Sequence, residues 1–488
     1  MTETKRSSWS GQLAFILAAA ASAIGLGNLW RFPYLAAQYG GGTFIVVYLA
    51  LVVTLGFTLM VTEISVGRLT RQAPLTAYSR MHRGWGFVGF LGTLVPVLIV
   101  PYYCVIGGWV VKYFVTYARI ALTGAVPPEL AGDAAGAGAF FNGFITANFA
   151  PFAYGCVFAL ICAGVIVLGV KNGIEKSNLV MMPLLFVLAL AISLYVVFLP
   201  GSGEGLKYYL VPSLDALAGP DGHFSFARLA KTILGALGQM FYSLSLAMGI
   251  MITYGSYMRR EDSIEKCVRR IEVFDTIIAV IAGLMIIPVV YMFAVKTGTP
   301  VKEAMNAGPG LMFITLPKVF ATIGKAGAWL GMAFFGLVIF AALTSAISLY
   351  EACVASVCDL LEIRRKPATF FIGALILFLS TFSALGYGAW GDIRLFAGIL
   401  SKDGLQFLDF FDFITNSVFM PIVALFTCVA IGWIMKPKVV TDEVEACGQP
   451  FKAKGIYIFF VKFFAPVLML VLLVSEVCRT LGIKGWSI

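Results

Sequence analysis

Long apolar segments recur along the whole of this 488-residue chain. A helix needs about 20 apolar residues to cross the hydrocarbon core of a bilayer. Hydrophobic residues make up 60% of the chain and charged residues only 12%, against about 25% in a soluble domain. We therefore predict an all-α integral membrane protein with eleven transmembrane helices, near residues 13–36, 41–67, 88–122, 152–170, 177–199, 229–257, 268–295, 327–361, 369–387, 408–435 and 455–479.

Several other classes of protein fit this composition poorly. The first segment is too long for a cleavable signal peptide. The longest gap between segments, residues 122–151, is rich in Gly and Ala and too short for an independent domain. Most of the nine cysteines fall inside apolar segments, where they serve as small packing residues rather than a disulfide framework. The net charge of +10 is explained by basic loops without invoking nucleic acid.

The basic residues predict the topology, because cytoplasmic loops carry an excess of Lys and Arg. They cluster after the even-numbered segments and at the N-terminus, at Lys5, Arg6, Arg68, Arg71, Arg80, Arg83, Lys171, Lys176, Arg259, Arg260, Lys266, Arg269, Arg270, Arg364, Arg365, Lys366, Lys436, Lys438, Lys452 and Lys454. Lysines 296, 302 and 318 on the other side weaken the bias without reversing it. We expect a multi-pass protein of the inner (plasma) membrane, with a cytoplasmic N-terminus and an extracytoplasmic C-terminus.

Two of the eleven segments contain residues that interrupt a helix. The first holds SAIGLGNLWRFPY, broken around residues 22–27, and the sixth holds YSLSLAMG, residues 242–249. Glycine costs a helix interior about 1 kcal/mol relative to alanine, and proline about 3 kcal/mol. Backbone groups that such breaks release inside a bilayer must line a cavity. Half-helix N-termini attract anions and free carbonyls attract cations, a combination that suits a zwitterion together with a small cation.

The two breaks stand at the start of two consecutive groups of five segments. Five is odd, so the second group enters the membrane from the opposite side, which predicts an inverted repeat. We divide the chain into a first repeat (1–200), a second repeat (201–440) and an eleventh helix with the C-terminus (441–488). In this arrangement the first and sixth helices are unwound at the membrane midplane.

Five stretches resemble the neurotransmitter:sodium symporter family and, within it, the bacterial amino-acid transporters. They are GLGNLWRFPY, GGGTFIVVY, GQMFYSLSLAMG, GPGLMFITLP and AALTSAIS, and the likeness runs from about Arg6 to the tenth segment. The resemblance implies sodium-coupled transport by alternating access, with two sodium ions and no organic cofactor.

Two sodium sites follow from the resemblance. The first would use the carbonyl of Ala23 and the side chains of Asn28, Ser243 and Asp275. The second would use the carbonyls of Ala21, Ile24 and Ala341 and the hydroxyls of Thr344 and Ser345. Oxygen ligands suit a hard cation. Taken singly, Thr344 and Ser345 are equally explained by hydrogen bonds to their own helix.

Asp275 is the most informative single residue, because an ionisable group inside an apolar run is costly. Many members of the family carry Asn at the matching position, and chloride-dependent members place a Ser one turn later, where this chain has Ala279. The Asp275 carboxylate would replace the charge of chloride, so we expect chloride-independent transport. Proton antiport, with Asp275 binding and releasing the proton, extends this hypothesis.

Gly25 indicates the class of substrate, because monoamine transporters of the family carry an aspartate there. The substrate carboxylate would lie near the amides of Leu26 and Gly27, and its amine near carbonyls of Ala23, Tyr242 and Ser243. The pocket would be lined by Ser22, Gly25, Ile99, Tyr103, Tyr242, Ser245, Met248, Ser345 and Leu349. This apolar lining favours neutral hydrophobic L-amino acids.

The preferred size of the substrate stays open. Met248 is flexible and favours a range from aliphatic to aromatic side chains. Ala247 and the hydroxyl of Tyr242 would instead narrow the pocket.

The resemblance also implies two gates. Outside, Arg31 would pair with an acid of the tenth segment, best matched by Asp412 with Asp409 as the competitor, above a lid formed by Tyr103 and Tyr242. Inside, Arg6 and Asp359 would close the exit, with Trp9, Ser256 and Tyr257 beside them. Glu63 would support the unwound backbone, whereas Glu351 has no assigned role beyond an internal polar contact.

The leading hypothesis is therefore a sodium-coupled amino-acid symporter, with a small-molecule substrate and the bilayer as its partners. One alternative is an amino-acid-binding membrane sensor with little transport, and another is a sodium-coupled carrier of a different small amine or amino acid. An enzyme is disfavoured because both histidines, His82 and His223, fall in loops and no nucleophile motif is present. The exact substrate, the sodium stoichiometry and the oligomeric state stay open.

Overall fold

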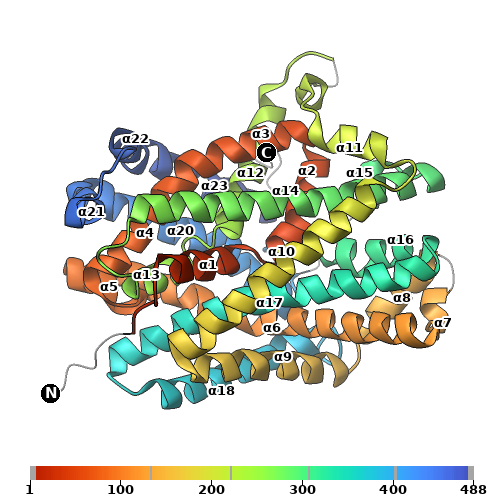
Figure 1. The fold of residues 1–488 in the computed structure, drawn as a ribbon, viewed down its shortest axis with the longest axis horizontal. Coiled ribbons are helices and arrows are strands. Elements are labelled where there is room, and N and C mark those ends of the chain that lie inside the picture. Colours follow the sequence, from red (N-terminus) through yellow and green to blue (C-terminus); the bar gives the residue numbers. More distant parts are fainter. Residues whose placement is uncertain (1–6, 132–133, 220–221, 306–307, 401–403, 482–488) are drawn as a thin grey trace.

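The structure is a computed structural model that describes residues 7–131, 134–219, 222–305, 308–400 and 404–481. Throughout these ranges the chain forms helices, and its β pairing is limited to isolated bridges between loops (Figure 1). Among the described residues nine helices are long and apolar enough to span a membrane, or ten if one bent pair counts as a single span. The prediction of an all-helical membrane protein is confirmed.

The nine long helices agree with nine of the predicted segments to within a few residues, apart from the N-terminal end of the fifth. They are Gly42–Thr70 (α3, η2 and α4), Gly86–Thr123 (α6), Ala150–Val167 (α9), Val170–Val197 (η3 and α10), Ile264–Thr297 (α14), Lys325–Leu361 (α17), Arg365–Leu385 (α18), Phe407–Ile434 (α19, η6, α20 and η7) and Lys454–Thr480 (α22, η9 and α23). Shorter helices connect them: α5 (Pro74–Met81), α7 (Pro128–Ala131), α8 (Ala134–Ile145), α11 (Ser202–Leu210), η4 (Leu214–Leu217), α15 (Val301–Ala304), η5 (Leu311–Thr315), α16 (Leu316–Thr322), α21 (Lys438–Val444) and η8 (Ala446–Gly448).

The first predicted segment is a bent pair of helices. α1 (Gln12–Ala23) ends just before Ile24, whose φ of −80° and ψ of 93° are extended. The chain returns to helix as the π-helix η1 (Gly27–Arg31) and then α2 (Phe32–Gln38), and the two halves are bent by 52°. Pro33 lies two residues after the end of η1 and has no N–H with which to continue the helical hydrogen bonds.

The sixth predicted segment consists of two helices separated by six non-helical residues, 244–249. α12 (Phe226–Ser243) precedes them and α13 (Ile250–Ser256) follows. Ser245 and Ala247 take left-handed backbone conformations, with φ of 53° and 59°, which cost a non-glycine residue about 1–2 kcal/mol each. Side-chain contacts hold this strained segment: Glu63 Oε1 accepts from the Ala247 N–H at 2.7 Å, and Ser245 Oγ donates to the Ser22 carbonyl at 3.0 Å.

The helices pack in two groups, and the first break lies between them. α6, α9, α17 and α18 contact one another and fill the lower half of the view in Figure 1. α4 (Phe57–Thr70) packs against α13, α3 (Gly42–Leu51) against α12, and α14 against α4. α1 contacts α14 on one side and α17 on the other. The unwound residues after α1 therefore lie buried between the two groups.

Candidate functional site

The Asp275 carboxylate is the centre of a buried polar cluster beside the first break. Asn28 Nδ2 donates to its Oδ1 at 2.8 Å, and Ser243 Oγ donates to the same oxygen at 2.8 Å. Tyr48 donates its hydroxyl to Oδ2 at 3.0 Å. All four side chains are buried. η1, α12, α14 and α3 thus bring together three of the residues expected at the first sodium site, and the backbone of the fourth, Ala23, is only two residues before Gly25.

Sequence reasoning missed Tyr48. It lies in the GGGTFIVVY stretch, but a tyrosine on an apolar helix gives no local sign of a polar partner. The Gly25 N–H donates to Asn28 Oδ1 at 3.3 Å, which orients the amide of Asn28 across the break. The acidic oxygens of Asp275 and the amide oxygen of Asn28 are the kind of hard ligands that an alkali cation takes.

The hydroxyls of Ser345 and Thr344, both expected at the second sodium site, have different hydrogen-bond partners. Ser345 Oγ donates to the Ser22 carbonyl at 3.0 Å and lies 3.5 Å from the Ile24 carbonyl, so it contacts the broken segment. The Thr344 hydroxyl bonds instead to its own helix, at 3.0 Å from both the Phe340 and Ala341 carbonyls. All of the residues expected here are buried: Ala21, Ile24, Ala341, Thr344 and Ser345.

A small central cavity of about 20 Å³ lies against both breaks. Eleven of its lining residues were expected to contact a substrate: Ser22, Ala23, Gly25, Gly27, Ile99, Tyr103, Tyr242, Ser245, Met248, Ser345 and Leu349. Asn28 and Ile250 complete the lining, and sequence reasoning had not placed Ile250 there. Leu26 and Ser243 do not line it: Leu26 faces the outer cavity described below, and Ser243 turns to Asp275. A cavity of this volume holds about one water, so a larger ligand requires its walls to move apart.

Two glycines of the first break are required by close packing. A Cβ at Gly25 would lie 2.6 Å from Ser345 Oγ and 3.2 Å from the Tyr103 hydroxyl. A Cβ at Gly27 would lie 2.4 Å from Cδ1 of Tyr242. A side chain as large as aspartate therefore has no space at residue 25 in this conformation.

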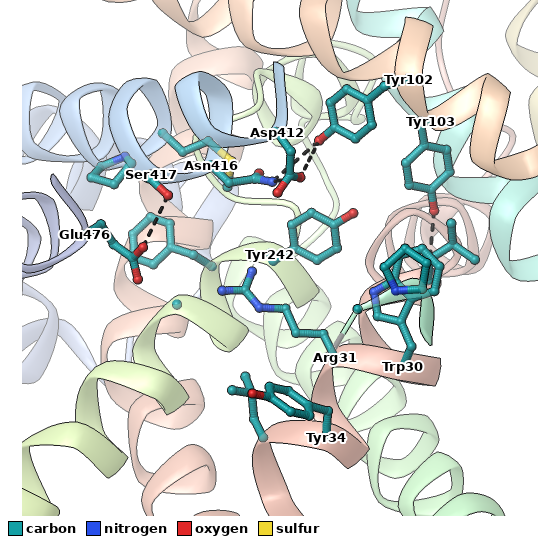
Figure 2. A pocket seen from close by; sticks show the side chains of 18 of the residues that line it. Trp30, Arg31, Tyr34, Tyr102, Tyr103, Tyr242, Asp412, Asn416, Ser417 and Glu476 are labelled. Atoms are coloured by element: carbon teal, nitrogen blue, oxygen red, sulfur yellow. Dashed lines mark hydrogen bonds between the residues drawn. The ribbon is translucent and has the colours of Figure 1, made fainter. Parts of the chain in front are cut away.

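Tyr103 and Tyr242 separate the central cavity from a larger one of about 300 Å³, the outer cavity, because both tyrosines line both spaces. The Leu26 N–H donates to the Tyr103 hydroxyl at 3.3 Å, which fixes this ring against the broken segment. Figure 2 shows Tyr242 lying near the Arg31 side chain, whose guanidinium carbon is 5.7 Å from the centre of the ring.

Asp412, rather than Asp409, shares the outer cavity with Arg31. Asp412 Oδ1 accepts from the Tyr102 hydroxyl at 3.1 Å and from Asn416 Nδ2 at 2.6 Å (Figure 2). Asp409 instead accepts from the Tyr387 hydroxyl at 2.9 Å and does not line the cavity. In the part of the chain that the structure describes, no ion pair joins Arg31 to either acid.

On the opposite side of the break, Trp9 is anchored to α13 and the residue after it. Its indole N–H donates to the Tyr254 carbonyl, and its backbone N–H to the Tyr257 carbonyl, both at 3.1 Å. Asp359 accepts from the Ala73 N–H at 2.6 Å. Arg6, its expected gate partner, lies outside the described residues. Ser256 Oγ donates to the Thr253 carbonyl at 2.5 Å.

Glu351, which had no assigned role, is fully buried in an ion pair. Its carboxylate accepts from Arg365 Nη1 and from the Tyr257 hydroxyl, each at 2.8 Å. This contact links α17, the start of α18 and the residue that follows α13. A buried acid in an apolar segment signals such a partner, but the sequence does not indicate which arginine it is.

A helical membrane protein with two broken helices around a polar centre has the architecture of a secondary transporter. The chain belongs to the sodium:neurotransmitter symporter family, whose model matches residues 6–126 and 153–486. It is 34% identical to an uncharacterized sodium-dependent transporter, YhdH, of Bacillus subtilis, over 87% of each chain. It is 25% identical to the human sodium- and chloride-dependent GABA transporter 2, over 90% of this chain and 75% of that one.

A solved structure of the same kind is MhsT in complex with L-phenylalanine. It matches with a TM-score of 0.81 and 34% identity, covering 97% of this chain and all of that one. The resemblance to the symporter family seen in the sequence is thereby confirmed, and the relatives named here are transporters rather than enzymes.

Proposed function

We propose that this protein is a sodium-coupled symporter that imports neutral hydrophobic L-amino acids by alternating access. The observation that carries the proposal is the Asp275 cluster. Its carboxylate is buried and accepts from three donors, but no ion pair among the described residues balances its charge, which favours a bound cation. We assign the first sodium ion to four ligands, Ala23, Asn28, Ser243 and Asp275. We assign the second sodium ion to five ligands, Ala21, Ile24, Ala341, Thr344 and Ser345. To bind this ion, the Thr344 hydroxyl would give up its hydrogen bonds to its own helix.

The substrate class follows from the central cavity. Its walls combine apolar side chains such as Ile99, Met248 and Leu349 with the backbone of the first break. Gly25 leaves no room for an acidic side chain of the protein, which favours a substrate that supplies its own carboxylate. MhsT, at 34% identity, was crystallised with L-phenylalanine, and this supports an amino acid in the same place.

Chloride independence and the outer gate belong to the same proposal. The Asp275 carboxylate would supply next to sodium the negative charge that chloride supplies in other members, since residue 279 is alanine. Arg31 and Asp412 would close the outer cavity over Tyr103 and Tyr242. The full arrangement has eleven spans, ten of them in a five-plus-five inverted repeat and the eleventh outside it. α12 and α13 are the two halves of the sixth span, and the N-terminus lies in the cytoplasm.

The decisive experiment is uptake into proteoliposomes of the purified protein. We expect accumulation of radiolabelled leucine or phenylalanine under an inward sodium gradient, competition by other neutral amino acids, and unchanged uptake when gluconate replaces chloride. Uptake at the same rate with and without the sodium gradient would overturn the central proposal. Uptake that requires chloride would overturn only the role assigned to Asp275. Tight binding without uptake would indicate a sensor.

A further inference from the structure

The last helix of the chain contributes charged side chains to the outer cavity. α23 (Ala465–Thr480) contributes Leu472, Glu476 and Arg479 to its lining, which also includes Arg31 and Asp412. Their spacing of four and three residues places them on one face of the helix. The cavity therefore contains two acids and two arginines, although the eleventh helix falls outside the inverted repeat that supplies the sodium ligands.

Two neighbouring residues in one turn of the tenth span donate hydrogen bonds to the two acids. Asn416 Nδ2 donates to Asp412 at 2.6 Å, and its neighbour Ser417 donates through Oγ to Glu476 Oε2 at 3.2 Å. Both belong to the π-helix η6 (Phe413–Phe419), and both line the cavity. The two carboxylates are thus tied to consecutive residues and stay together if this turn moves.

Arg31 is paired with neither of these acids and could form an ion pair with either one. Within the described residues it forms no ion pair with Asp412 or with Glu476, and its guanidinium lies beside the Tyr242 ring. Figure 2 shows Arg31 extending into the cavity, with the Asp412 and Glu476 carboxylates on the walls around it. Glu476 already accepts from Arg479 Nη2 at 2.5 Å. Arg479 is 62% exposed, so this bond competes with water and is readily exchanged.

We propose that Glu476 is a second acceptor for Arg31, and that the outer barrier depends on which acid Arg31 selects. Pairing with Asp412, which contacts Tyr102, draws Arg31 toward α6 and over the two lid tyrosines. Pairing with Glu476 holds Arg31 toward α23 and leaves the approach to Tyr103 and Tyr242 clear. Arg479 competes for Glu476 and so favours the closed arrangement. Glu476 is a positioning residue that acts through Arg31.

The two residues of α23 therefore have opposite expected effects. Glu476→Gln leaves Arg31 with Asp412 alone and closes the cavity, whereas Arg479→Gln frees Glu476 for Arg31 and opens it. We would place a cysteine in the outer cavity by Ile106→Cys and measure its reaction rate with an uncharged methanethiosulfonate, in proteoliposomes without sodium or substrate. The chain without the added cysteine provides the background rate.

We expect the rate to fall about two- to five-fold in Glu476→Gln and to rise by a similar factor in Arg479→Gln, the range of a solvent-accessible ion pair. Asp409→Asn, which removes an acid outside the cavity, is the matched control and should leave the rate unchanged. In an Arg31→Gln background both α23 variants should have no effect. Rates that change in the same direction, stay constant, or still change without Arg31 would overturn the inference.

The reagent is uncharged, so the altered potential of the cavity does not change its local concentration. The thiolate is the reacting form of the added cysteine, and its fraction rises when Glu476 is neutralised and falls when Arg479 is neutralised. Both of these effects oppose the rate changes expected here, so they cannot produce them. Arg479→Gln tests the inference by itself if Glu476→Gln fails to fold. The inference rests on the proposed alternating-access transport, but the measurement uses neither sodium nor substrate. A failure of the Glu476 gate is therefore distinguishable from a failure of sodium coupling.

Discussion

The amide of Asn28 and the carboxylate of Asp275 are joined by a buried hydrogen bond of 2.8 Å, although 246 residues lie between them in the chain. The bond connects η1, where the chain becomes helical again after the first break, to α14. It also aligns two oxygen-bearing side chains beside the break that separates α1 from η1.

Asn28→Ala should abolish sodium-driven uptake while the protein still folds. The substitution removes one proposed sodium ligand and one donor to Asp275, so we expect a loss of at least about ten-fold, or ~1.4 kcal/mol. Uptake in proteoliposomes measures it, and gel filtration verifies folding. Asn142→Ala, an exposed asparagine of α8, is the control. Full sodium dependence in Asn28→Ala would remove Asn28 from the site.

Replacing the Asp275 carboxylate by a site for chloride should make transport depend on chloride. Asp275→Asn alone should lower uptake strongly, because the bound cation loses its counter-charge. Adding Ala279→Ser one helical turn later should restore activity only when chloride is present. Uptake in chloride and in gluconate media compares the two variants with the unmodified protein. The idea fails if the double variant is active in gluconate.

Gly25→Ala should weaken substrate binding, because its Cβ would lie 2.6 Å from Ser345 Oγ. We expect the substrate concentration for half-maximal uptake to rise about ten-fold, in line with the 1–3 kcal/mol typical of overpacking. Gly143→Ala is a matched control, since nothing lies within 4 Å of the added methyl group. Equal effects of the two substitutions would show that close packing at Gly25 is unimportant.

Met248 should determine the size preference of the central cavity. Met248→Phe fills more of the space and should favour leucine over phenylalanine, whereas Met248→Ala should favour the aromatic substrate. One methylene in an apolar pocket is worth about 1–3 kcal/mol, so the ratio of the two uptake efficiencies should shift by ten-fold or more. Competition uptake measures this ratio, and an unchanged order in both variants would place the selective wall elsewhere.

Glu63→Ala should destabilise the protein by about 1–3 kcal/mol, because the Ala247 N–H would lose its buried acceptor. Glu63→Gln retains a carbonyl oxygen and should be milder. Thermal unfolding in detergent compares the two. If both variants unfold at the same temperature as the parent, the strained segment does not depend on Glu63.

Much of the architecture could be predicted from local properties of the sequence. The length of each apolar run sets where helices such as α6 and α17 begin and end, since a span must match the bilayer. Gly25, Gly27 and Pro33 mark the first break because glycine and proline weaken a helix wherever it packs. The resemblance of these stretches to a known family then indicated which distant residues to examine.

Contacts between helices were harder to predict, because they depend on how the helices rotate and cross. No local signal joins Tyr48 to Asp275, or Arg365 to Glu351. Asp409 and Asp412 are three residues apart in α19 (Phe407–Asp412), and only tertiary contacts distinguish them. Asp412 meets Tyr102 of α6 in the outer cavity, whereas Asp409 meets Tyr387.

The sequence by itself determined that the chain is a bundle of membrane helices with two breaks, because hydropathy and helix propensity act over a few turns. Only the tertiary structure decided how these breaks are completed. It shows that Ser345 reaches the first break while Thr344 bonds to its own helix, and that α23 contributes Glu476 to the outer cavity. These outcomes depend on a few ångströms of side-chain placement between helices that are far apart in the chain, which no local pattern encodes.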